Sequence, residues 1–280
     1  MTTTTTRSAV EPTSPLRLGS GGSARRRVLA LAAAEIRLLL RNRTAVMNSV
    51  LLPLAMVAAV GAITASNGGT VDGPGLVASS IGVTLTFVTF YNLVTTFVAR
   101  REELVLQRMR TGELTDAEVL LGTAVPTLLV TVVQVVLVAV GVVVLGEWSA
   151  PVDVVLPLVA LLGGGALMVV LAVVNTSFTR TVEAAQFTTM PLVLAAAMLS
   201  GLLIPLADFP EQVAQVARFL PLTPVIELSR LGLVGRTWNG QAVDTAGAWA
   251  ASPLALAVLA GWLVGGAILA RLVFRWAPRR

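Results

Sequence analysis

Long uncharged stretches dominate the hydrophobic pattern of this chain. Six windows contain no charged residue, and each is longer than the roughly 20 residues that a helix needs to cross a bilayer: 44–71, 73–99, 119–146, 154–179, 184–207 and 245–270. A chain in hydrocarbon must satisfy its backbone hydrogen bonds internally, so each window is expected to form a helix. We predict an all-α membrane protein whose single transmembrane domain, 44–275, has six helices, at about 44–66, 76–99, 117–145, 153–174, 186–207 and 252–274.

The composition supports membrane insertion rather than a soluble fold. The 280 residues are 55% apolar and 12% charged, with a mean hydropathy of +0.84, whereas about a quarter of the residues of a soluble domain are charged. Buried helices of a soluble protein are the alternative. Six uninterrupted windows would, however, leave so small a chain with too little polar surface.

The basic residues, all of them Arg, indicate the orientation of the chain. An even number of spans places both termini on one side, and all but three of the 20 arginines fall in segments of that side. The positive-inside rule then places both termini in the cytoplasm. A pI near 11.3 fits arginines facing anionic lipid and not nucleic acid, whose binding face would be water-exposed. Exclusive use of Arg is typical of a GC-rich genome, so we expect a multi-pass protein of a bacterial plasma membrane.

Two segments precede the first predicted span. Residues 1–24 are rich in Thr, Ser, Gly and Pro, which predicts a disordered cytoplasmic tail and not a signal peptide. The next segment, 25–43, has apolar residues on one side of a helical wheel and arginines on the other: Arg26, Arg27, Arg37 and Arg41. This pattern predicts an N-terminal amphipathic helix that lies in the inner membrane interface.

The loop between the second and third spans is charged and has helix signals at both ends. Residues 100–110 can continue the second span as a helix, and Gly112 favours a stop. Thr115 with Glu118 forms a capping box that opens the third span. Charges of this kind suit a docking site for a soluble partner, and a simply solvated face explains them equally well.

The segment between the fifth and sixth spans, about 208–251, is long and patterned. A Pro and two acids at 208–211 indicate a helix start, and apolar residues follow at helical spacing. Residues 225–233 can form a second short helix. We therefore predict short extracellular helices here. Gly201 and Pro205, just before them, are positioned to interrupt the fifth span.

The absent residue types exclude several kinds of chemistry. The chain has no His, Cys or Lys, so it offers no imidazole base, no thiolate, no His- or Cys-ligated metal and no Lys for a Walker A phosphate loop. Asp153 and Glu183 lie at span ends, whereas proton-coupled transporters need ionisable residues near the membrane centre. We expect no enzymatic activity, no metal and no cofactor. A secondary transporter or channel is the alternative function, although the sequence shows no internal repeat.

Five amide side chains lie in or near the predicted spans. In hydrocarbon such groups usually bond to neighbouring helices. We interpret them as contacts between helices, with a substrate contact as the alternative: Asn48, Asn92, Gln134, Asn175 and Gln186.

Two stretches carry a family resemblance. In 99–122 (ARREELVLQRMRTGELTDAEVLLG), an Arg/Glu run leads to a short turn and a capped helix. In 199–233 (LSGLLIPLADFPEQVAQVARFLPLTPVIELSRLGL), a small–Gly–apolar–Pro pattern precedes a Pro-Glu helix start, Leu-Pro and an Arg. Both resemble the permease subunit of type-2 ABC exporters, especially the actinobacterial daunorubicin-resistance kind, and the resemblance covers about 25–275. Many relatives have Pro where Gly112 stands. The matching signature positions after span five are Gly201, Pro205, Pro210, Glu211, Leu220, Pro221 and Arg230.

This resemblance implies a function. It implies a dimeric permease, either a homodimer or a heterodimer, that works with a separate ABC ATP-binding subunit and has no ATP site of its own. A hydrophobic or amphipathic substrate would leave the cell between the two permease copies; antibiotic, drug, lipid-linked sugar and lipid all suit an apolar path. The resemblance also implies ATPase-facing residues in the loop after span two and in the entry helix: Arg101, Glu102, Glu103, Arg108, Thr111, Gly112, Glu35 and Arg37.

Overall fold

The structure is a computed structural model of the chain, and it describes residues 73–103, 116–144 and 146–273 together with single helical positions between 33 and 66. The predicted tail, 1–24, lies outside the described residues, as do most of the first predicted span and most of the loop after the second. Four of the residues that the resemblance implies as ATPase-facing also lie outside them: Glu35, Arg108, Thr111 and Gly112.

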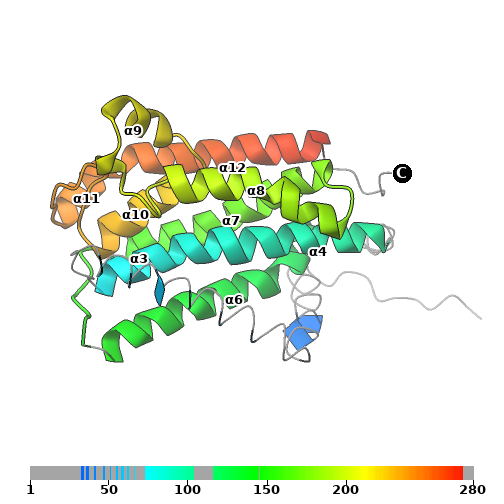
Figure 1. The fold of residues 1–280 in the computed structure, drawn as a ribbon, viewed down its shortest axis with the longest axis horizontal. Helices are drawn as coiled ribbons and strands as arrows, with labels where there is room; N and C mark the ends of the chain where they lie inside the picture. The colour runs from blue at the N-terminus through cyan, green and yellow to red at the C-terminus, as the bar shows by residue number, and fades with distance from the viewer. Residues whose placement is uncertain are drawn as a thin grey trace, which may run out of the picture.

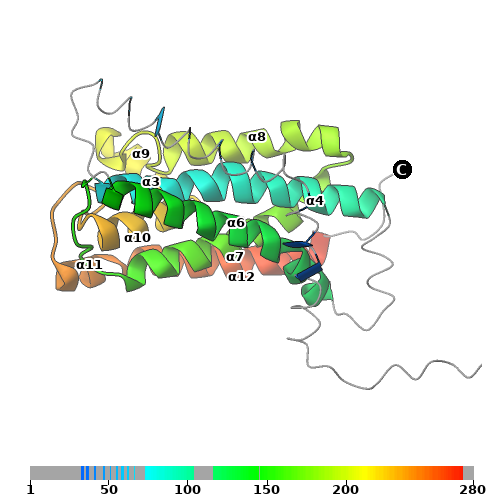
Figure 2. The same cartoon turned by 90° about the horizontal axis from the view of Figure 1, so that it is seen from below.

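Five helices in the described part of the chain are long and apolar enough to cross a membrane. The first, Gly73–Glu102, comprises α3 (Gly73–Val83), the π-helix η1 (Thr84–Phe90) and α4 (Tyr91–Glu102); the others are α6 (Asp116–Val144), α7 (Val155–Phe178), α8 (Val182–Leu199) and α12 (Pro253–Val273). They lie side by side along the longest axis of the molecule (Figure 1, Figure 2). The described residues contain one isolated antiparallel bridge, between Arg236 and Ala242, and no strand. The prediction of an all-α membrane protein is confirmed.

The bundle has two distinct ends (Figure 1). At one end gather the short helices α9 (Glu211–Ala217), α10 (Thr223–Leu233) and α11 (Thr245–Ala251), and we call it the cap end. At the other end α4 finishes, and α7 turns into α8 through residues 179–181. We call this the elbow end.

The central helix of the bundle is α7. It packs against η1, α4, α10 and α12, and its buried residues Leu156, Leu167 and Ala172 join the main hydrophobic core. Of the apolar stretch of α7, 56% is buried, against 22% for α8 and 17% for α12. Such exposed apolar faces carry no penalty in lipid, because lipid tails are as apolar as the side chains themselves.

Helix α8, which corresponds to the fifth predicted span, differs in its bounds from the predicted 186–207. Helix α8 starts and ends earlier. It starts earlier because the Thr181 side chain caps it, accepting a backbone N–H at 3.2 Å, and because an acid such as Glu183 is favourable at the positive end of a helix dipole. It ends earlier because Gly201 adopts a φ of +83°, a left-handed conformation that stops a helix.

Both short helices predicted between spans five and six are present, but only one lies at the surface. Helix α9 exposes Val213 and Val216, as expected of a helix at an interface. Helix α10 is buried along nearly its whole length and packs against α3, α7 and α12. Apart from Glu227 and Arg230 its side chains are apolar or small, so it fits inside the bundle.

The close approach of α10 to α7 depends on Gly232. A Cβ atom at this position would lie 2.2 Å from Pro157 Cδ and 2.9 Å from the backbone oxygen of Asp153, and neither a proline ring nor the backbone can rotate away. We expect Gly232→Ala to lower stability by about 1–3 kcal/mol, the usual cost of overpacking. The measurement is the thermal midpoint in detergent, by fluorescence-detected size exclusion.

Gly261→Ala is the matched control, because nothing lies within 4 Å of a Cβ atom at that position. It should unfold at or slightly above the midpoint of the unchanged chain, because Ala favours a helix interior over Gly. Equal midpoints for the two variants would contradict the close contact between α10 and α7.

Candidate functional site

The end of α4 carries three of the residues that the resemblance implies as ATPase-facing. Glu102 is the last residue of the helix, and Glu103 follows it, donating its backbone N–H to Ala99 O at 2.9 Å. Both glutamate side chains are exposed. Arg101, in contrast, is 0% exposed. This differs from the expectation that its side chain faces a partner, and it places Arg101 inside the protein.

The Arg101 guanidinium is directed at the end of α7. Its Nη1 donates to Thr176 O at 2.8 Å, and its Nη2 donates to Thr179 O. The last carbonyls of a helix have no intrahelical partner and carry a partial negative charge, so a cation is favourable there. Arg101 therefore caps α7 from a neighbouring helix.

Hydroxyl and amide side chains hold the elbow between α7 and α8. Thr179 Oγ1 lies 2.7 Å from Thr188 Oγ1, and Asn175 Nδ2 donates to Thr188 O at 2.9 Å. The prediction that Asn175 bonds between helices is confirmed. Thr179 and Thr188 are not among the residues predicted from the sequence, although hydroxyl residues gathered at the boundary of a span are a signal for helix capping.

The structure brings only part of the implied ATPase-facing set together. Arg101, Glu102 and Glu103 lie at the elbow end, where Arg180 of the elbow is also exposed. Arg37 is exposed at a described helical position. The remaining members of the set lie outside the described residues.

The signature residues shape the turns of the cap end. Gly201 supplies the left-handed turn that follows α8. The others lie at the ends of short helices, where a fixed proline φ favours a helix start: Pro205 before the 3-10 helix η2 (Leu206–Asp208), Pro210 and Glu211 at the start of α9, Pro221 before α10 and Arg230 in the last turn of α10.

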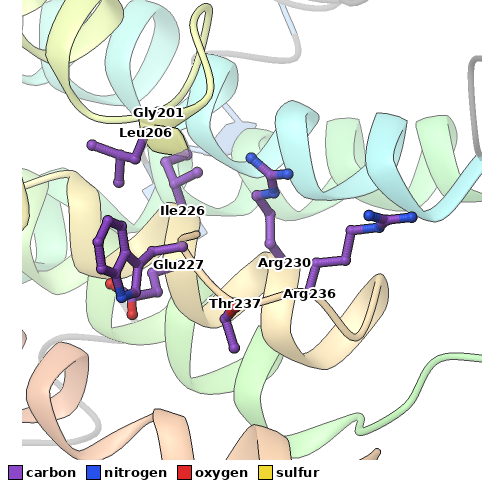
Figure 3. A pocket seen from close by; sticks show the side chains of 8 residues that line it. Gly201, Leu206, Ile226, Glu227, Arg230, Arg236 and Thr237 are labelled. Carbon is purple, nitrogen blue, oxygen red and sulfur yellow. The ribbon is translucent and has the colours of Figure 1, made fainter. Parts of the chain in front are cut away.

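A small cavity lies between these turns and α10 (Figure 3). Its volume is about 10 Å³, which is room for about one water molecule. In Figure 3 the side chains of Arg230 and Arg236 extend away from Glu227. The cavity is too small for a drug-sized substrate, so this region positions the cap. Its lining residues are Gly201, Leu206, Ile226, Glu227, Arg230, Arg236, Thr237 and Trp238.

A buried ion pair connects the end of α9 to α10. Arg218 Nη2 lies 3.0 Å from Glu227 Oε1, with 16% and 3% of the two side chains exposed. The same guanidinium is 4.9 Å from the ring centroid of Trp238. Burial raises the pKa of the Glu227 carboxyl above its ordinary value of 4.5, and the Arg218 charge partly opposes that rise. Trp262 Nε1 donates to Phe219 O at 2.8 Å, which ties this corner to α12.

Polar side chains inside the bundle are only partly paired. Thr89 Oγ1 of η1 lies 2.5 Å from Thr131 Oγ1 of α6, but the buried Gln134 carboxamide has a hydrogen-bond partner on neither atom. The prediction that amides join helices therefore holds for Asn175 and not for Gln134. Among the described residues, no group of three or more His, Cys, Asp or Glu could hold a metal ion.

Long apolar helices that carry their charges at the two ends of a bundle are typical of an integral membrane protein. The family model of the ABC-2 type transporter matches residues 26–234, which is most of the chain, and the chain belongs to this family. The match includes the elbow end and runs to the end of α10, while α12 follows it. No curated protein matches the chain.

Family membership establishes the coarse function. The chain is the transmembrane permease component of an ABC transporter, a component that lacks an ATPase site of its own. The family implies an ABC ATP-binding partner. The resemblance to type-2 ABC permeases seen in the sequence is thus confirmed.

The Arg218–Glu227 pair makes the stability of the cap depend on pH. Because the pKa of Glu227 is raised, the folded state favours the neutral carboxyl. This stabilisation is complete below the ordinary value of 4.5 and is lost as the pH rises through the raised pKa. We expect the thermal midpoint of Glu227→Gln to rise relative to that of the unchanged chain as the pH rises above 4.5 and through the raised pKa.

Glu211→Gln, at an exposed position of α9, is the control for the loss of one negative charge on the cap. A difference between Glu227→Gln and the unchanged chain that stays constant over this pH range would show that the pKa of Glu227 is not raised.

Proposed function

We propose that this chain is one of two permease copies in an ATP-driven bacterial exporter that moves a hydrophobic or amphipathic molecule, such as an antibiotic or a drug, out of the cell. The observation that carries the proposal is the match to the ABC-2 type transporter family over residues 26–234. The resemblance of 99–122 and 199–233 to daunorubicin-resistance permeases supports outward transport of such a molecule. A homodimer is the simplest assembly and a heterodimer the alternative. ATP is bound by the partner, and the permease itself holds no cofactor.

The elbow end is the proposed docking surface for the ATP-binding partner. Glu102, Glu103 and Arg180 are exposed there and offer charges of both signs. Gly73–Glu102 is one continuous helical span, and its far part, α3, packs against α10 at the cap end. A tilt imposed at the elbow end by closure of the partner on ATP is therefore carried to the cap end along this continuous span.

The surface of the described helices suits an apolar cargo. A groove of about 500 Å³ lies between α7 and α12, and its volume is in the range of small-molecule sites. Every residue that lines it is apolar or glycine, including Leu171, Val174, Phe219, Val258 and Leu269. An ion or a free sugar would find few polar partners on such a surface, which favours a hydrophobic or amphipathic molecule.

A secondary transporter or channel is the alternative, and it would work without an ATP-binding partner. Proton-coupled devices need an ionisable group near the membrane centre. In the described spans the Asp, Glu and Arg residues lie in terminal turns, as Glu118, Glu183 and Arg271 do. This placement favours the ATP-driven proposal.

The first test is co-purification with the ABC ATP-binding subunit that the family implies, followed by reconstitution in lipid. We expect the pair to hydrolyse ATP at a rate different from that of the ATPase alone. The double charge reversal Glu102→Arg with Glu103→Arg should weaken assembly at least about tenfold, which corresponds to about 1.4 kcal/mol.

Glu147→Arg, an exposed glutamate beyond the end of α6, is the charge-reversal control and should assemble normally. Unchanged hydrolysis in the pair would remove the support for an ATP-driven permease. Intact assembly of the double variant would exclude Glu102 and Glu103 as docking residues.

The second test is the orientation of the chain, and the absence of Cys makes it direct. We expect Gln212→Cys in α9 to react with a membrane-impermeant maleimide on intact cells, and Glu103→Cys to react only after permeabilisation, because the positive-inside rule places the elbow end in the cytoplasm. Both positions are exposed. The reverse pattern would rule out the elbow end as the ATPase-docking surface.

A further inference from the structure

Arg101 is the largest fully buried side chain in the described part of the chain. It belongs to the last turn of α4, directly before the exposed Glu102 and Glu103. Its guanidinium donates to Thr176 O at 2.8 Å and to Thr179 O, which lie 75 and 78 residues further along the chain. A single side chain therefore fastens the second span to the end of the fourth.

Moving the Arg101 guanidinium away from these carbonyls is energetically unfavourable. An arginine side chain cannot lose its proton in a protein, so a guanidinium pulled away from these two carbonyls would keep its charge inside the protein, away from water. Here its acceptors are carbonyls at the negative end of the α7 dipole, and hydrogen bonds from a cation to such groups are stronger than neutral ones. The planar guanidinium also presents donors in a fixed fork, which sets the direction of α4 relative to α7.

The same network continues into α8. Thr179, which accepts from Arg101 through its backbone oxygen, uses its hydroxyl to meet Thr188 Oγ1 at 2.7 Å. Asn175 on α7 donates to the backbone oxygen of Thr188 at 2.9 Å. Thr181 then caps the first turn of α8. The ends of α4, α7 and α8 are thus joined by hydrogen bonds into one unit.

We propose that Arg101 is a positioning residue that clamps the end of α4 to the elbow between α7 and α8, so that a movement of the exposed end of α4, at Glu102 and Glu103, is passed to α7 and α8. The inference rests on the proposed function only for the source of that movement, which is the ATP-binding partner. The elbow, with its exposed Arg180, then follows the end of α4 as part of a single rigid body.

The clamp is tested first in the permease alone. Spin labels on Glu103→Cys and Arg180→Cys, both at exposed positions of a chain without Cys, report the distance between α4 and the elbow in lipid nanodiscs. We expect one narrow distance in the unchanged background and a broadened or shifted distribution in Arg101→Gln. Arg271→Gln, which removes an exposed arginine at the end of α12, should keep the narrow distance. An unchanged distribution in Arg101→Gln would overturn the clamp.

The second measurement uses the complex with the ATP-binding subunit. We expect Arg101→Gln to co-purify with the partner at the normal level, because the exposed docking residues are intact. The difference in the rate of ATP hydrolysis between the complex and the ATPase alone should nevertheless fall about tenfold, which is within the usual range of coupling between sites. Arg101→Lys should restore part of it, since an ammonium group can still donate to the two carbonyls. A purely structural role would lower assembly and hydrolysis together, and full coupling in Arg101→Gln would refute the proposal.

Two further variants keep the test decisive if Arg101→Gln does not fold. Thr188→Val removes the hydroxyl contact with Thr179 without touching the buried charge, and Arg101→Lys keeps that charge. Both should broaden the distance between α4 and the elbow, and unchanged distributions in both would overturn the clamp. If the unchanged chain has no effect on ATP hydrolysis, the proposed function fails, while the distances still judge the clamp.

Discussion

The need to pair backbone N–H and C=O groups where no water is present constrains this structure more than any other interaction. Within a membrane helix they pair with one another, but the first N–H groups and the last C=O groups of each helix have no such partner. At the elbow end, side chains provide the missing partners: Arg101, from a neighbouring helix, for the end of α7, and Thr181, directly before α8, for the start of that helix. Polar residues therefore gather at helix ends, which are also the places that a soluble partner subunit can reach.

The two ends of the bundle meet this constraint with different chemistry and different consequences. At the elbow end, carbonyl groups of α7 accept from a buried cation. At the cap end, Glu227 pairs with Arg218, and the Trp262 N–H meets the carbonyl of Phe219. Because α10 is inserted among α3, α7 and α12, the cap is part of the core and not a lid upon it. A shift of the second or fourth span must therefore displace α10 and the contacts that depend on it.

Hydropathy and charge predict most of the fold because a long apolar stretch in lipid has to form a helix. Charge-free windows give the wrong helix start where a charged residue is itself part of the helix. Glu183 lies in the first turn of α8, so the window that begins after it starts later than the helix does. The sequence also does not show that α10 is buried, because Glu227 and Arg230 are residue types that usually lie at the surface. At the candidate site, four consecutive charged residues follow Ala99 in the sequence, and only the packing of α4 on α7 shows that Arg101 alone among residues 101–103 points inward.

The middle of the bundle holds several buried polar groups without hydrogen-bond partners. Thr86, Thr123 and Gln134 are buried with side-chain polar atoms that lack hydrogen-bond partners, whereas buried polar groups in a settled core are nearly always satisfied. The π-helix η1 lies in the same region, and such turns are common at functional sites. Unsatisfied groups lower the cost of rearranging their surroundings, since fewer hydrogen bonds have to break. A middle with fewer hydrogen bonds to break is what a permease needs if its spans are to shift against one another.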